Sequence, residues 1–202
     1  NSITRNLTMK QHALDAVISK VPQITLLFWG IKILATTFGE TAGDALSMSL
    51  NIGYLLSTFI FALIFFAFVI VQIRAKSYHP YLYWFTIIAS TTVGTTLADF
   101  VDRSLGIGYV GGSSLLLSLV LISLFIWYKV EGSISPHSVN YPRAELFYWL
   151  TITFSQTLGT ALGDWSADTA GLGYSGGIFL YTGLILVILA LYFWTNISRT
   201  LL

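Results

Sequence analysis

Three aspartates, Asp44, Asp99 and Asp164, stand at the ends of long apolar stretches and share the residues around them. A threonine lies seven residues before each of them, at Thr37, Thr92 and Thr157. Carboxylate and hydroxyl oxygens are the ligands that hard cations such as Mg²⁺, Mn²⁺ and Ca²⁺ prefer. The pattern therefore predicts a cation-binding site, in which the three aspartates are also the candidate ligands of a metal ion.

The spacing places these side chains on one face of a helix. At about 100° per residue, the aspartate, the threonine and the residue four positions before the aspartate form one polar stripe. In the first copy that residue is Glu40, which joins the predicted site. The two small residues of a G-x-x-x-[G/A] pattern before each aspartate fall on another face, where they let two membrane helices approach closely. We expect the three polar stripes to meet around one axis.

The shared surroundings define a sequence repeat. A tryptophan lies fifteen residues before each aspartate, and a Gly-Tyr pair follows nine and ten residues after it. Matching columns in three ungapped copies indicate a true internal repeat. We predict a cytoplasmic N-terminal segment over residues 1–20 and repeats over 21–78, 79–142 and 143–202. Each repeat would contain two spans and keep the orientation of the previous one, which makes the repeats parallel.

The elements that would position the aspartates are membrane-spanning helices. Of the 202 residues, 55% are hydrophobic and 9% are charged, whereas soluble domains carry about 25% charged residues. A spanning helix needs about 20 mostly apolar residues. Six stretches are candidates, at roughly 22–44, 50–73, 80–99, 110–129, 144–164 and 175–195. The expected fold is an all-α polytopic membrane protein with about six transmembrane helices, and the lipid bilayer is its first partner.

Basic residues predict the orientation, because they concentrate in cytoplasmic loops. Eight of them flank one side of the spans: Arg5, Lys10, Lys20, Arg74, Lys76, Lys129, Arg143 and Arg199. The opposite loops hold only Arg103, beside most of the acids. We expect a multi-pass protein of a bacterial inner (cytoplasmic) membrane with its N-terminus in the cytoplasm. Lys32 lies inside a span, where it would either extend to the cytoplasmic face or pair with a carboxylate of a neighbouring helix.

Several classes of function lack the residues they need. The chain has no cysteine, which excludes disulfides and thiolate metal sites, and its net charge of +1 gives no sign of nucleic-acid binding. It has no G-x-S-x-G, no H-E-x-x-H and no phosphate-binding loop. We expect a protein that is not an enzyme and has no cofactor beyond a bound divalent cation. Acids that hold a metal to activate water would make a membrane hydrolase the enzymatic alternative.

These features predict an integral membrane transporter of a small cation, with Mn²⁺ or a similar hard divalent ion as the candidate substrate. One alternative is a scaffold or sensor without transport activity, in which each aspartate binds the amides of its own outer loop. Another is a transporter of an organic solute, which would need an apolar pocket lined by the repeated tryptophans and tyrosines. A transporter of cations requires instead that the aspartates converge on a hydrated cavity.

The combination of the Trp, the Thr, G-x-x-x-[G/A]-D and G-Y-x-G-G resembles a bacterial family of uncharacterised membrane-anchored proteins built from a repeat of unknown function. The resemblance covers about residues 20–202, although the first copy has Leu56-Ser57 in place of Gly-Gly. It implies no established chemistry. Because such proteins commonly have four units, it implies that a fourth repeat is missing here. Otherwise three-fold pseudosymmetry or a homo-oligomer would complete the bundle.

Overall fold

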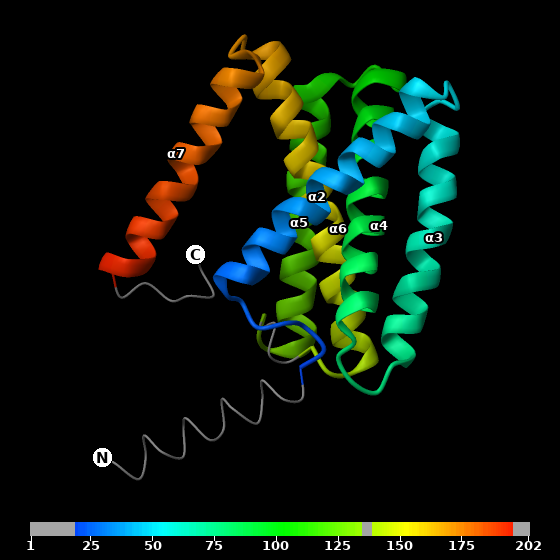
Figure 1. The fold of residues 1–202 in the computed structure, drawn as a ribbon, viewed down its shortest axis with the longest axis vertical. Coiled ribbons are helices and arrows are strands. Elements are labelled where there is room, and N and C mark those ends of the chain that lie inside the picture. Colours follow the sequence, from blue (N-terminus) through cyan, green and yellow to red (C-terminus); the bar gives the residue numbers. More distant parts are fainter. Residues whose placement is uncertain (1–18, 135–138, 196–202) are drawn as a thin grey trace.

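The computed structural model describes residues 19–134 and 139–195 (Figure 1). The predicted N-terminal segment 1–20 lies outside the described residues except for Ser19 and Lys20, and so does the end of the predicted third repeat, residues 196–202. Within the described ranges the chain forms long α-helices and no strand. The helices are α2 (Leu26–Asp44), α3 (Tyr54–Arg74), α4 (Pro80–Asp99), α5 (Gly108–Glu131), α6 (Pro142–Asp164) and α7 (Gly173–Trp194). The predicted all-α fold with about six helices is therefore confirmed.

Three of these helices, α3, α5 and α7, are long and apolar enough to cross a membrane. Helices α2, α4 and α6 contain 19, 20 and 23 residues, which is also close to the length of a span. They carry more Thr, Ser and Gly than the other three. Large apolar side chains such as Leu121, Phe125 and Leu186 are exposed on the outer helices. An apolar surface of this extent fits contact with lipid rather than water.

Local sequence signals set several helix ends. Pro80 and Pro142 occupy the start of α4 and α6, where the missing amide hydrogen removes no helical bond. Thr25 precedes α2, and its Oγ1 accepts a hydrogen bond from Phe28 N at 3.2 Å. Gly132 ends α5 with a φ of 74°, a left-handed conformation that favours glycine.

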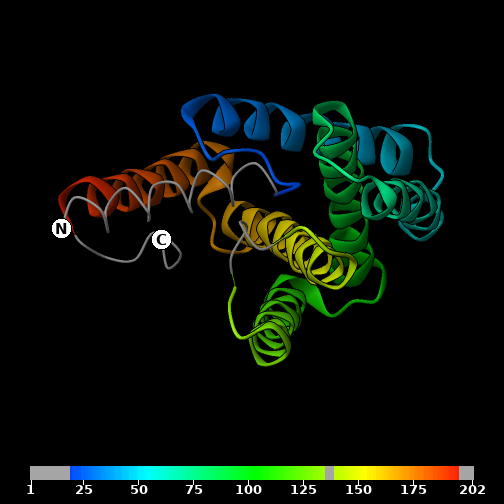
Figure 2. The same ribbon diagram turned by 90° about the horizontal axis from the view of Figure 1, so that it is seen from below.

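Helix α4 is the centre of the bundle and packs against α2, α3 and α6 (Figure 1). Helix α5 packs in turn against α6. The second helix of one repeat therefore lies on the first helix of the next repeat, as α3 does on α4 and α5 on α6. Helix α7 extends away from the other helices (Figure 2) and contacts mainly the turn that precedes it. No first helix covers α7 within the described part of the chain.

Glycines of the G-x-x-x-[G/A] pattern mark the close approaches between first helices. A Cβ on Gly39 of α2 would lie 2.9 Å from the Ile88 carbonyl oxygen and 2.9 Å from Thr91 Cβ, both on α4. A Cβ on Gly94 of α4 would lie 3.0 Å from Thr157 Oγ1 on α6. The predicted packing role of the glycine face is thus seen in copies one and two.

Candidate functional site

Each first helix changes its winding immediately after the repeated aspartate. Helices α2, α4 and α6 pass without a break into five-residue π-helical turns, η1 (Ala45–Ser49), η2 (Phe100–Ser104) and η4 (Trp165–Thr169). Amides donate to carbonyls five residues earlier: Leu50 N to Ala45 O at 2.9 Å, Leu105 N to Phe100 O at 3.0 Å and Ala170 N to Trp165 O at 2.9 Å. Such turns are rare and often occur at functional sites. We call this end of the bundle the acidic end, and the opposite one the basic end.

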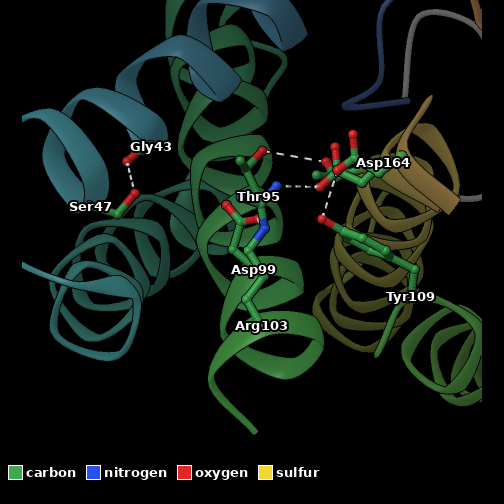
Figure 3. A network of polar contacts seen from close by, with 9 residues as sticks. Gly43, Ser47, Thr95, Asp99, Arg103, Tyr109 and Asp164 are labelled. Carbon is green, nitrogen blue, oxygen red and sulfur yellow. Dashed lines mark hydrogen bonds and ion pairs between the residues drawn. The ribbon is translucent and has the colours of Figure 1, made fainter. Parts of the chain in front are cut away.

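Arg103 of η2 joins the aspartates of two repeats (Figure 3). Its Nε lies 3.0 Å from Asp99 Oδ1, and its Nη2 lies 3.3 Å from Asp164 Oδ2. Asp99 is only 3% exposed, so the guanidinium supplies the counter-charge that a buried carboxylate needs. Asp44 is within electrostatic range of the same arginine. The sequence pattern gave Arg103 no role. Its position as the only basic residue of the acidic loops could have indicated that it pairs with the aspartates.

Asp102 is a second buried carboxylate, in η2. It is 5% exposed, and neither carboxylate oxygen has a hydrogen-bond partner among the described residues. A Cβ on Gly112 of α5 would overlap Asp102 Oδ1, so this glycine makes room for the carboxylate. Burial raises the pKa of Asp102 to about 6; the Asp164 carboxylate adds to this rise, and Arg103 opposes it.

A cavity of about 720 Å³ lies between α2, α6, η4 and α7. Three predicted site residues, Thr37, Glu40 and Asp164, line it. Thr160 of α6 and Tyr181 of α7 border the same space. Gly159 and Gly163, the third copy of the glycine pair, also face this cavity, and a Cβ on either would meet nothing within 4 Å. The polar stripes of the first and third repeats thus meet at one cavity.

The other predicted site residues lie elsewhere. Thr92 and Thr157 are buried in helix packing and donate hydrogen bonds to the carbonyl oxygens of Ile88 and Thr153, one turn earlier. Asp44 and Asp99 are not among the residues that line the cavity. No group of three or more His, Asp or Glu side chains within residues 19–134 and 139–195 is arranged to hold a metal ion. The metal-ligand role of the three aspartates stays a prediction.

A polar network lies below the carboxylates, at the level where α2, α4 and α6 meet. Lys32 Nζ donates to Gln156 Oε1 at 2.8 Å, and Thr91 Oγ1 donates to the same oxygen at 2.5 Å. Gln156 Nε2 in turn donates to Ser90 Oγ at 2.7 Å. Gln156 and Thr91 both line the cavity. Within the described chain, Lys32 therefore neither pairs with a carboxylate nor extends freely to the cytoplasmic face, because its ammonium binds Gln156, a residue that the sequence pattern had not singled out.

Two of the repeated tryptophans lie at the basic end, away from the cavity. Trp149 is buried against Tyr83 and Tyr148, whose hydroxyls are 2.6 Å apart, and Trp84 packs edge-on against Tyr83. Of the tyrosines in the Gly-Tyr pairs, Tyr174 lines the cavity. The tryptophans therefore have a packing role at this end of the helices.

The comparison with protein families agrees with the repeat seen in the sequence. The family described as a Repeat of Unknown Function (DUF347) matches residues 27–78, 82–133 and 147–198, which together make up more than half of the chain. Each match contains one α-to-π junction and lies inside one of the three predicted repeats. No curated protein and no solved structure matches the chain significantly. The protein therefore belongs to the DUF347 family and is built from three copies of its repeat.

Proposed function

We propose that this membrane protein transports a small cation, which binds in the cavity between α2, α6 and α7. The observation that carries the proposal is the placement of two carboxylates, Glu40 and Asp164, on the wall of a cavity of about 720 Å³. Glu40 has no ion-pair partner in the described part of the chain, so its charge is available to a ligand. The other acids at this end add a negative field that concentrates cations.

The dimensions of the cavity favour a hydrated or organic cation over a bare metal ion. Small-molecule sites typically enclose about 300–1,000 Å³, and this cavity falls in that range. A hard divalent ion such as Mn²⁺ would need several oxygen ligands, about six or more for the larger ions. Glu40, Asp164, Thr37 and Thr160 would supply some of them, with water as the remainder.

A scaffold would use the aspartates differently. In that case each carboxylate would accept hydrogen bonds from the amides of its own turn. Asp44, Asp99 and Asp164 make no such capping bond to η1, η2 or η4. The amide-binding scaffold is therefore not seen, but only Asp164 of the three aspartates lines the cavity, and Arg103 pairs with both Asp164 and Asp99.

The orientation and membrane are part of the same proposal. The basic residues Arg74, Lys76, Lys129 and Arg143 lie at the basic end, which we assign to the cytoplasm by the positive-inside rule. The acidic end would then face the outside of a bacterial inner membrane. No enzymatic step and no cofactor is needed for this function.

Uptake into proteoliposomes tests the proposal with two probes, tetramethylammonium and Mn²⁺. Tetramethylammonium has a permanent charge and does not cross a lipid bilayer by itself. We expect saturable uptake of at least one probe, and a loss of affinity of about tenfold or more in Glu40→Gln, equivalent to about 1.4 kcal/mol. Glu40 is exposed and makes no described hydrogen bond, so this variant should fold normally.

Asp168→Asn is the matched control, because Asp168 is an exposed acid of η4 that does not line the cavity. It should take up both probes as the wild type does. If neither probe enters the proteoliposomes faster than it enters protein-free vesicles, cation transport is ruled out. Equal losses in Glu40→Gln and Asp168→Asn would assign the effect to surface charge rather than to the cavity.

A further inference from the structure

We propose that the cavity has a second subsite, formed by Lys32 and Gln156, which binds a carboxylate group of the transported solute. The inference rests on the proposed function and specifies its substrate class, a small zwitterion with an ammonium and a carboxylate. Such a solute would place its ammonium beside Glu40 and Asp164 and its carboxylate beside Lys32.

The first argument concerns the charge of Lys32. An ammonium group within a span costs about 2.5–3.5 kcal/mol on insertion scales unless it is compensated. Two other described cations have acid partners: the buried Lys20 lies 2.5 Å from Glu145, and the exposed Arg103 of η2 bridges two aspartates. No acid lies within ion-pair distance of Lys32 in the described chain, and its bond goes to the neutral oxygen of Gln156. The counter-charge is therefore left for a ligand to supply.

The second argument concerns position. Lys32 and Glu40 are eight residues apart on α2, and Gln156 and Asp164 are eight residues apart on α6. Eight residues of helix span about 12 Å. Helices α2 and α6, which both pack on α4, thus repeat one arrangement, with a carboxylate toward the acidic end and a hydrogen-bonding or cationic group about two turns below. Lys32 itself is not among the residues that line the cavity, but Thr36, one turn away, lines it, and so does Gln156, which binds the Lys32 ammonium.

The third argument concerns the donors around Gln156. Its amide links α6 to Ser90 and Thr91 of α4 and to Lys32 of α2. A carboxylate that replaces the Gln156 oxygen as acceptor would receive the Lys32 ammonium and the Thr91 hydroxyl from two helices. Hydrogen bonds between an ammonium and a carboxylate are roughly twice as strong as neutral ones. Replacement of the Gln156 oxygen by a ligand carboxylate therefore favours binding, because the contact of Lys32 with a neutral amide becomes an ion pair.

Two ligands that differ only in the carboxylate test the subsite: γ-butyrobetaine and butyltrimethylammonium. Both carry the same permanently charged ammonium. Titration calorimetry on the purified full chain should show that γ-butyrobetaine binds at least about tenfold more tightly. In Lys32→Met, which keeps most of the side-chain length without the charge, the ratio of the two affinities should fall to about one.

Gln156→Glu is the second variant, in case Lys32→Met does not fold. It places a carboxylate beside Lys32, so the ammonium is neutralised within the protein, and the preference for γ-butyrobetaine should again disappear. Equal binding of the two ligands to the wild type would overturn the subsite and leave cation transport intact. An unchanged preference in either folded variant would also overturn it. No binding of either ligand, together with no uptake of the cation probes, would reject the proposed function itself.

Discussion

At the scale of single residues, the acidic end is organised around one arginine. Arg103 contacts Asp99 and Asp164 directly and also lies 5.9 Å from the centre of the Tyr109 ring. A single guanidinium cannot neutralise every acid at this end, so the local charge stays negative when the carboxylates are ionised. The arginine thus fixes the positions of two carboxylates without removing the attraction for cations.

Asp102 leads to a pH-dependent prediction. Its pKa in the folded protein, about 6, lies above the ordinary value of 3.8 because the carboxyl is buried. The folded state therefore binds this proton more tightly than the unfolded chain does. The contribution of Asp102 to stability is greatest below about pH 4 and is lost as the pH rises to about 6. Asp102→Asn removes the charge and should melt a few degrees above the wild type near pH 8, and at the same temperature near pH 4.

Tryptophan fluorescence of the detergent-solubilised protein measures this difference across the pH range. Asp168→Asn, which removes an exposed charge nearby, should keep the pH dependence of the wild type. A lower melting temperature of Asp102→Asn near pH 8 would contradict the account. It would mean that the ionised carboxylate is bound to an ion or a donor.

At the scale of elements, the contact between α2 and α4 depends on Gly39. A methyl group at this position would lie 2.9 Å from backbone and side-chain atoms of α4, so the two helices would have to separate. We expect Gly39→Ala to lower the free energy of unfolding by about 1–3 kcal/mol. Gly30→Ala is the control on the same helix, because a Cβ there meets nothing within 4 Å.

Thermal unfolding in detergent compares the two glycine variants. Gly30→Ala should be neutral or stabilise by up to about 1 kcal/mol, since alanine is the better helix former. Equal stability of Gly39→Ala and Gly30→Ala would show that the close approach of α2 to α4 does not contribute to the free energy of unfolding.

The helices and repeats were predictable from the sequence because they depend on local signals. Apolar runs of about 20 residues, two prolines at helix starts and the recurring glycines determine them. The π-helical turns were not predictable in this way, since the apolar run simply continues through residues such as Ala45 and Leu46. Thr92 shows a second limit. Helical periodicity gives the face on which a residue lies, but the packing of neighbouring helices decides whether that face borders a cavity.

The candidate site was partly predictable. Glu40, Asp164 and Thr37 follow from the polar stripe, and the structure brings them to one cavity. The network of Lys32, Gln156 and Thr91 joins three helices that are far apart in sequence, and no local pattern encodes such a contact.

At the scale of the whole molecule, orientation can be tested by chemical labelling. The chain has no cysteine, so single cysteines can be introduced without further changes. Ser77 lies exposed at the basic end and Thr169 lies exposed at the acidic end. In intact cells a membrane-impermeant maleimide should label Thr169→Cys and not Ser77→Cys. Labelling of Ser77→Cys alone would reverse the orientation, and labelling of both would contradict the membrane placement.

The packing order also leaves one side of the bundle open. Gly159 and Gly163 of α6 have no helix against them within the described residues, unlike Gly39 and Gly94. A helix of a fourth repeat, or of a second copy of the chain, would pack between this face and α7. Both stay predictions, and either would border or fill the cavity that Glu40 and Asp164 line.

The π-helical turns also bear on how the protein arose. Each hydrogen-bonded ring in such a turn contains one residue more than the corresponding ring of an α-helix. All three turns begin at the residue after the repeated aspartate and have the same length of five residues. Three independent insertions at one position are far less economical than a single one that was later copied. Duplication of one two-helix unit that already had its aspartate and its widened turn would produce this recurrence in a single event.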